Sequence, residues 1–178
     1  MSPESDYSIR PARPADALAL QQHCFPTQTV EEVASYLNWC LRQAERGRLV
    51  RLVAEANGEA IANAQLTLHG GIAEIGSLVV ADNYRGCGIG TVLITTLLEA
   101  ARMRGVQAVE IGVQPDNEDA CALYLRLGFV PHRQVETRYI PGGRVLYLRR
   151  TITPPTFLIL TGNRTSCQLV PHHLEGAT

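Results

Sequence analysis

The chain has 178 residues, enough for one domain with a sizeable core, and its composition of 46% hydrophobic and 19% charged residues is typical of a folded protein. Its 16 basic and 17 acidic residues leave a formal net charge of -1, which removes the electrostatic argument for binding nucleic acid or an anionic membrane. All the basic residues are arginines. Without lysine, Schiff-base and pyridoxal phosphate chemistry and a Gly-Lys-Ser/Thr phosphate loop are excluded.

The five cysteines are odd in number, widely scattered and form no Cys-x-x-Cys pair, so we expect reduced thiols and no metal site. The first six residues are polar and acidic, without a basic region before an apolar run, so no signal peptide is expected. No apolar stretch approaches the roughly 18 residues of a membrane span. These features predict a cytoplasmic protein with neither a membrane nor a nucleic acid as its partner.

Strand and helix signals alternate along the first third of the chain. Residues 7–10 are extended, and a proline in the first turn favours a helix over 14–21. Thr29 and Glu32 have the spacing of a capping box and open a second helix, which Gly47 can end. The sequence therefore predicts one short strand followed by two helices.

A hairpin follows these helices. Residues 49–56 and 60–68 are β-compatible runs joined by Asn57-Gly58, a dipeptide that tolerates two positive φ angles. A third extended run, residues 74–80, comes after a Gly-Gly break. Three consecutive strands are therefore expected.

The rest of the domain alternates again. Apolar periodicity predicts a helix over 88–104, a strand over 106–113 and a helix from Asp116 or Asn117 to residue 127. Residues 129–139 and 144–151 then form an antiparallel pair. The resulting order, β-αα-βββ-α-β-α-ββ, predicts an α/β (α+β) fold with a mixed central sheet covered by helices.

The domain boundaries follow from changes in composition. We expect a disordered start over residues 1–6 and one domain over 7–153. After a Pro-Pro break, residues 154–178 form a C-terminal extension in which 157–160 are compatible with one more strand. This extension is either a disordered end or an arm that packs on its own domain or on a second subunit.

The most informative segment is a glycine-rich loop between a strand and a helix. Glycines at positions 86, 88 and 90 remove Cβ atoms at alternate places, so successive main-chain amides can turn toward one bound oxyanion. The positive end of the following helix dipole adds to this attraction, and Arg85 supplies a cationic edge. The loop is thus a candidate cradle for a diphosphate.

A dinucleotide-binding fold is the main alternative for this loop. In Gly86-Cys87-Gly88 the third glycine of that fingerprint comes one place early, at Gly90. Glu110 lies twenty residues beyond, roughly where a ribose-binding acid would stand. Three antiparallel-looking strands nevertheless precede the loop in place of a first βα unit, which disfavours this alternative.

These residues resemble the GCN5-related N-acetyltransferases, or GNAT family, which bind acetyl-coenzyme A. The family signature Arg/Gln-x-x-Gly-x-Gly/Ala is matched by Arg85, Gly88 and Gly90. A second signature is matched by residues 117–129, in the family's order and separation. Together with the order of elements, the resemblance covers residues 7–151.

The resemblance implies the GNAT fold, in which the strand before the loop separates from its parallel neighbour and admits the pantetheine arm of acetyl-CoA. Main-chain groups of Leu78, Val79 and Val80 would pair with this arm as an added strand does. Asn117 and Tyr124 would contact it from the last helix. The pyrophosphate would be held by the main-chain amides of Gly86, Cys87, Gly88, Ile89, Gly90 and Thr91.

The resemblance also implies direct transfer of the acetyl group to an amine. Tyr124 matches the family's general acid, which protonates the leaving sulfur. Glu74 stands where the histone-modifying members place a base that keeps the amine neutral, although many relatives use ordered water instead. Glu110, His23 and His69 are weaker candidates for the base.

The acceptor is expected to be a small amine or an amino acid. Arg138, Tyr139 and Arg144 lie in a hairpin that either recognises a carboxylate or phosphate on this acceptor or is simply an exposed basic turn. The alternatives are acetylation of a protein N-terminus or side-chain amine, and a catalytically silent CoA-binding sensor. The C-terminal extension also leaves a homodimer open.

Overall fold

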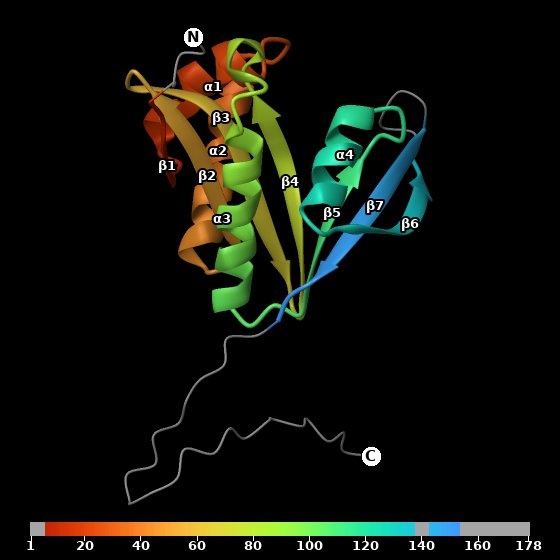
Figure 1. Ribbon diagram of the computed structural model, residues 1–178. Coiled ribbons are helices and arrows are strands. Elements are labelled where there is room, and N and C mark those ends of the chain that lie inside the picture. The colour runs from red at the N-terminus through yellow and green to blue at the C-terminus, as the bar shows by residue number, and fades with distance from the viewer. Residues whose placement is uncertain (1–5, 138–142, 154–178) are drawn as a thin grey trace, which may run out of the picture.

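The computed structural model describes residues 6–137 and 143–153, which fold around one seven-stranded sheet (Figure 1). The strands lie in the order β1-β2-β3-β4-β5-β7-β6. The expected disordered start over residues 1–6 lies outside the described residues except for Asp6. The predicted C-terminal extension, residues 154–178, lies outside them entirely.

The order of elements confirms the predicted α/β fold. The strands are β1 (Ser8–Pro11), β2 (Leu49–Ala56), β3 (Glu59–His69), β4 (Ile72–Val80), β5 (Ala108–Val113), β6 (Val130–Glu136) and β7 (Arg144–Thr151). The helices are η1 (Pro14–Asp16), α1 (Ala17–Cys24), α2 (Val30–Glu45), η2 (Asp82–Tyr84), α3 (Ile89–Met103) and α4 (Glu118–Arg126).

Two local signals in the sequence act as expected. Asn57 and Gly58 adopt φ angles of 53° and 82°, which match the right-handed twist of the β2–β3 hairpin. At the start of α2 the Glu32 amide donates to Thr29 Oγ1 at 3.2 Å, and the Thr29 amide donates to Glu32 Oε2 at 2.8 Å. Both ends of this capping box are therefore satisfied.

The first helix differs from its predicted bounds. The proline opens the 3-10 turn η1, and α1 begins only at Ala17 and continues to Cys24. The buried Asp16 explains this break, because its carboxylate accepts hydrogen bonds from the Arg13 amide at 2.7 Å and from the guanidinium of Arg10. These bonds hold the chain in a tight turn before the α-helix can start.

Helices cover both faces of the sheet. Leu20 of α1 and Leu37 of α2 belong to one buried cluster, which includes Val53 of β2. The larger cluster lies on the other face and joins Leu97 of α3 to Tyr124 of α4. In Figure 1, α3 lies over the β2–β4 half of the sheet, whereas α4 lies beside β5 and β7.

The pairing of β4 with β5 divides the sheet into two halves. All neighbouring strands are antiparallel except this pair, whose parallel register covers only Ile72–Ile75 and Ala108–Ile111. Beyond this short segment the two strands diverge toward the top of Figure 1. The predicted splayed parallel pair is thus present.

Candidate active site

The open part of β4 carries main-chain groups that no neighbouring strand uses on the β5 side. After Ile75 the strand runs five residues further, to Val80, without a β5 partner. A β-bulge lies in this part, since two residues of β4, Ser77 and Leu78, oppose the single Ala64 of β3. Ser77 has the positive φ of 50° that this bulge requires. The strand therefore presents a bent, unpaired edge to the gap.

The glycine loop presents free donors at one end of this edge. Within the described residues, the main-chain amides of residues 86–91 donate to no protein acceptor, and the first helical bond of α3 joins the Val92 amide to Gly88 O at 3.1 Å. Gly86 and Gly88 have φ angles of 75° and 79°, and a Cβ atom on either would project into open space. This arrangement fits a bound phosphate.

Arg85 contributes less positive charge than the sequence suggested. Its guanidinium forms an exposed ion pair with Asp82 at 2.7 Å, and its Nε donates to Val80 O at 3.3 Å. The pair is close to neutral, so attraction of an anion at this loop depends on the amides and the N-terminus of α3. The Val80 carbonyl oxygen already accepts this hydrogen bond from Arg85.

The other loop residues reach a ligand through their backbone. Ile89 is buried, so its side chain belongs to the core beneath the loop. A Cβ atom on Gly90 would lie 3.7 Å from Leu123 Cδ2, which shows that the start of α3 approaches α4. Cys87 is exposed. Its thiol points back to Arg85 O at 3.7 Å, so this side chain is a spacer within the loop.

Helix α4 carries the two remaining predicted contacts. Asn117 caps the helix by accepting a hydrogen bond from the Ala120 amide at 3.1 Å, and its side-chain nitrogen can still donate to a ligand. Tyr124 is 6% exposed and packs at 6.2 Å from the ring of Phe129. Burial, with a smaller effect of Cys121, raises the pKa of Tyr124 to about 12. The phenol therefore stays protonated at neutral pH.

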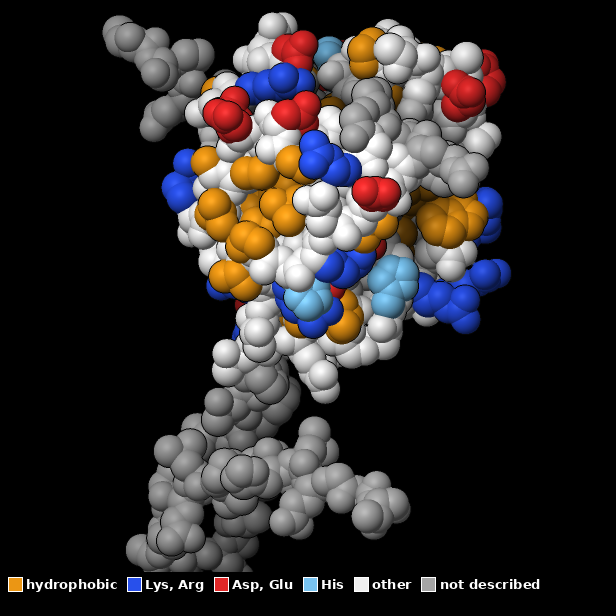
Figure 2. Space-filling model, turned by 90° about the vertical axis from the view of Figure 1, so that its right-hand side faces the viewer, with side chains coloured by type: hydrophobic (Ala, Val, Ile, Leu, Met, Phe, Trp, Pro, Cys, Tyr) orange, Lys and Arg blue, Asp and Glu red, His pale blue; other side chains and the backbone are white. Residues whose placement is uncertain are grey.

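Glu74 and Glu110 lie opposite each other in the parallel register of β4 and β5. Arg149 donates to Glu110 Oε1 at 2.6 Å, and Arg133 donates to Glu110 Oε2 at 2.9 Å. His132 Nε2 lies 3.7 Å from Glu110 Oε1. Figure 2 shows arginine and histidine side chains on the face of the molecule that lies at the right of Figure 1. Glu74 has no hydrogen bond or ion pair within the described residues, so its carboxylate is available.

The charge partners of Glu110 also set its proton affinity. Burial by itself raises the pKa of this carboxyl, but the hydrogen bonds from Arg133 and Arg149 outweigh burial and lower the pKa below its ordinary value. A carboxylate with both oxygens engaged is a poor proton acceptor. Of the two acids, Glu74 is therefore better suited to be a base.

The other candidates are less well placed or lie elsewhere. His23 Nε2 contacts Glu59 Oε2 at 3.0 Å, and His69 stands exposed at the end of β3. Arg144 is exposed at the start of β7, and Arg138 and Tyr139 lie outside the described residues.

A buried arginine network escaped the sequence analysis. Arg51 is only 3% exposed, and its guanidinium donates to Gln65 Oε1 at 2.7 Å and to Asn63 Oδ1 at 2.6 Å. Tyr36 covers this guanidinium with its ring, 5.3 Å away, and exchanges hydrogen bonds with Gln65. The signal was present, because a charged residue interrupts the apolar run of β2.

Comparison with known proteins identifies the family. Residues 15–129, more than half of the chain, match the family described as Acetyltransferase (GNAT) family. The chain belongs to the GNAT family. GNAT members are N-acetyltransferases by the names of the relatives, and the resemblance seen in the sequence is confirmed.

The relatives include N-alpha-acetyltransferase 30 of Schizosaccharomyces pombe, 37% identical over 76 residues, which are 43% of this chain and 49% of that protein. L-methionine sulfoximine/L-methionine sulfone acetyltransferase of Pseudomonas aeruginosa is 27% identical over 109 residues, 57% of this GNAT chain and 62% of that protein. The chain thus matches about half the length of the first of these relatives.

The fold has many solved counterparts. The structure of YncA of Salmonella typhimurium, solved with its cofactor acetyl-CoA, has a TM-score of 0.67 and 21% identity, with 83% of this chain and 94% of that chain covered. This likeness shows that both chains share the GNAT fold. Among the described residues of this GNAT chain, no helix is long and apolar enough to cross a membrane.

Proposed function

We propose that this GNAT protein is an N-acetyltransferase that moves the acetyl group of acetyl-CoA directly to a primary amine. The observation that carries the proposal is the gap after Ile75, where the free edge of β4 leads to the free amides of residues 86–91. An extended, amide-containing chain that ends in a pyrophosphate fits both parts of this surface. We place the catalytic domain at residues 7–153.

The binding residues follow from this fit. Main-chain groups of Leu78, Val79 and Val80 would hold the pantetheine arm, and Asn117 would reach it through its side-chain nitrogen. Arg85 would lie at the rim, where Asp82 neutralises it. The pyrophosphate would accept hydrogen bonds from the amides of Gly86, Cys87, Gly88, Ile89, Gly90 and Thr91.

Two side chains would supply the proton chemistry, while the thioester supplies the acetyl group. Glu74 would accept a proton from the acceptor ammonium, directly or through water, because only the neutral amine is nucleophilic. Tyr124 would donate its phenolic proton to the leaving sulfur. Its raised pKa keeps the phenol protonated at neutral pH, so the hydroxyl can donate to the leaving sulfur.

For the acceptor we propose a small amine or an amino acid. Support comes from the Pseudomonas relative, whose name gives derivatives of methionine as its substrates. A protein N-terminus is the second candidate, favoured by the likeness to N-alpha-acetyltransferase 30. A catalytically silent CoA sensor is disfavoured, because it would not need the buried phenol of Tyr124 at this position.

An amine panel tests the proposal. Purified protein is mixed with acetyl-CoA and, separately, with free amino acids, polyamines and peptides with unblocked N-termini, and thiol release is followed with a thiol reagent. We expect amine-dependent release for at least one class, with the acetylated product identified by mass spectrometry. N-acetylated versions of the same compounds are the matched controls. Release that does not depend on the amine, despite tight CoA binding, would instead support the sensor.

A further inference from the structure

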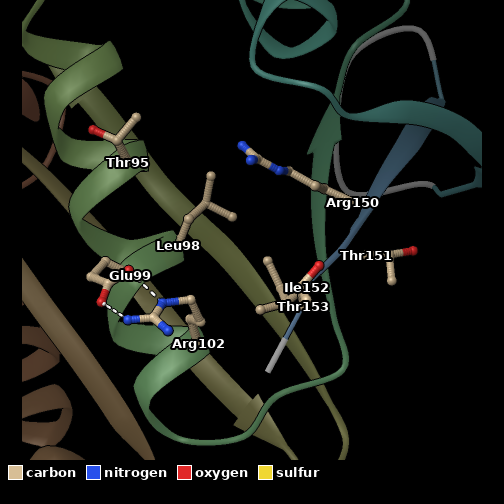
Figure 3. A pocket seen from close by; sticks show the side chains of 8 residues that line it. All are labelled: Thr95, Leu98, Glu99, Arg102, Arg150, Thr151, Ile152 and Thr153. Carbon is tan, nitrogen blue, oxygen red and sulfur yellow. Dashed lines mark hydrogen bonds and ion pairs between the residues drawn. The ribbon is translucent and has the colours of Figure 1, made fainter. Parts of the chain in front are cut away.

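A pocket of about 300 Å³ lies away from the glycine loop, at the other end of α3. Two segments line this pocket (Figure 3). The lining residues are Thr95, Leu98, Glu99 and Arg102 of α3, and Arg150, Thr151, Ile152 and Thr153 at and just after the end of β7. Helix α3 packs on β2, β3 and β4, whereas β7 pairs with β5 and β6. The walls therefore belong to the two different halves of the splayed sheet.

One arginine in this pocket, Arg150, has no acidic partner among residues 6–137 and 143–153. Arg150 donates through Nη1 to Leu127 O at 2.6 Å, and within the described residues its Nε and Nη2 meet no acceptor. Figure 3 shows its side chain reaching from β7 toward Thr95 and Leu98. The edge formed by Nε and Nη2 is the fork that binds a carboxylate through two parallel hydrogen bonds.

The second arginine of the pocket is already neutralised. Arg102 donates from Nε to Glu99 Oε2 at 2.8 Å and from Nη2 to Oε1 at 2.7 Å, as the dashed lines in Figure 3 show. Both oxygens of Glu99 are thereby used within α3. In the part of the chain that the structure describes, no carboxylate therefore compensates the charge of Arg150.

The remaining walls favour a ligand with a small apolar body. Leu98 and Ile152 are each 7% exposed and form part of the core beneath the pocket. The hydroxyl of Thr95 already donates to Thr91 O and Val92 O of its own helix. Few polar groups besides Arg150 are therefore free to bind a ligand at this wall, which suits an alkyl group.

The end of α3 does not oppose an anion strongly. The last carbonyls of a helix carry partial negative charge, but here Ala101 O accepts from the amides of Arg104 and Val106, and Arg102 O accepts from the Gly105 amide. Arg104 Nη1 caps Ala100 O as well, at 3.0 Å. The charge of Arg150 is thus not cancelled by exposed carbonyl ends.

We propose that this pocket is a binding site for a small monocarboxylate, held by the Arg150 fork with its alkyl group on Leu98 and Ile152. A ligand in this position would contact α3 and β7 together and so bridge the two halves of the sheet. The site is separate from the glycine loop, so the inference does not depend on the proposed catalytic function.

Butyrate is the probe, and uncharged butyramide of nearly the same shape is its control. Titration of the full-length, ¹⁵N-labelled protein should give saturable amide shifts at Thr95, Thr151 and Ile152, with a dissociation constant on the order of 1 mM for so small a ligand. Butyramide should bind at least tenfold more weakly. Absence of saturation, or equal binding of both compounds, would overturn the proposal.

Three variants locate the site. R150Q should weaken butyrate binding at least tenfold, whereas R104Q, which removes an arginine that also donates to one main-chain carbonyl, should bind as the wild type does. T95F occupies part of the pocket while leaving Arg150 in the chain, and it should also abolish binding while the melting temperature stays within a few degrees. Equal losses in R150Q and R104Q would contradict the proposal, as would a matching loss of CoA affinity in R150Q.

Discussion

Glu74 and Glu110 stand in register across the only parallel strand pair of the described sheet, yet their carboxylates are in opposite situations. Arginines from β6 and β7 engage both oxygens of Glu110, whereas Glu74 has no hydrogen bond or ion pair among the described residues. The division of roles follows from the register, which places Arg149 beside Glu110 on β7. One acid therefore serves structure, and we propose that the other serves catalysis.

Replacing Glu74 by glutamine should lower kcat/KM at neutral pH by about 10²-fold, the usual contribution of a general base. The unfolding free energy should change little, because within the described residues this carboxylate makes no hydrogen bond or ion pair that would be lost. Rates measured from pH 6 to 9 should recover in the variant as the free amine becomes more abundant. Unchanged activity at pH 7 would assign the base to water.

Replacing Glu110 by glutamine should instead lower the unfolding free energy by about 1 to 3 kcal/mol. This loss lies between the losses expected for breaking an exposed and a buried ion pair. The folded-state pKa of Glu110 is lowered, so its contribution is present above the unfolded pKa of about 4.3 and is lost as pH falls through the folded pKa. Urea unfolding between pH 3 and 7 should show this loss in the wild type and not in the variant. An identical pH dependence of both proteins would refute the assignment.

Removing the phenolic hydroxyl of Tyr124 should lower kcat by about 10²-fold while the affinity for CoA stays within twofold. Because the pKa of Tyr124 is raised to about 12, no alkaline loss of activity should come from this group below about pH 10. Tyr124→Phe and the control Tyr7→Phe are compared by steady-state kinetics and calorimetry. Full turnover in Tyr124→Phe would show that another group protonates the sulfur.

Adding a methyl group at Gly88 should weaken CoA binding at least tenfold, because its Cβ would enter open space at the loop where we propose that the pyrophosphate binds. The variant Gly88→Ala also forces alanine to a φ of 79°, at a cost of about 1–2 kcal/mol. Gly47→Ala imposes the same strain at a φ of 69° far from the loop and is the matched control. Both should lose stability, but only Gly88→Ala should lose affinity.

Replacing the buried Arg51 by lysine should destabilise the protein. Arg51→Lys keeps the charge but cannot donate to Gln65 and Asn63 in the same fork geometry, so we expect a loss of about 2 kcal/mol in unfolding free energy. Arg104→Lys, at the exposed end of α3, should cost less than about 0.5 kcal/mol. Comparable losses in the two variants would mean that the network contributes nothing specific.

Much of the fold was predictable because its signals are local. The Thr29–Glu32 capping box, the Asn57-Gly58 turn and the glycine loop each depend on residues a few positions apart, and each has the expected conformation in the structure. The bounds of the first helix were wrong because they depend on Asp16, whose carboxylate is also bound by Arg10, six residues earlier and on the first strand.

The sequence by itself determined the order of the elements, the family and the position of the loop, since hydrophobic period, caps and glycine spacing act within one or two turns of chain. Only the tertiary structure decided which charges are free. Asp82 neutralises Arg85, two arginines occupy Glu110, and Arg150 faces α3 with no acid beside it among the described residues. In most of these contacts the partners lie on different elements, so strand register and the packing of α3, rather than spacing along the chain, set which of them meet.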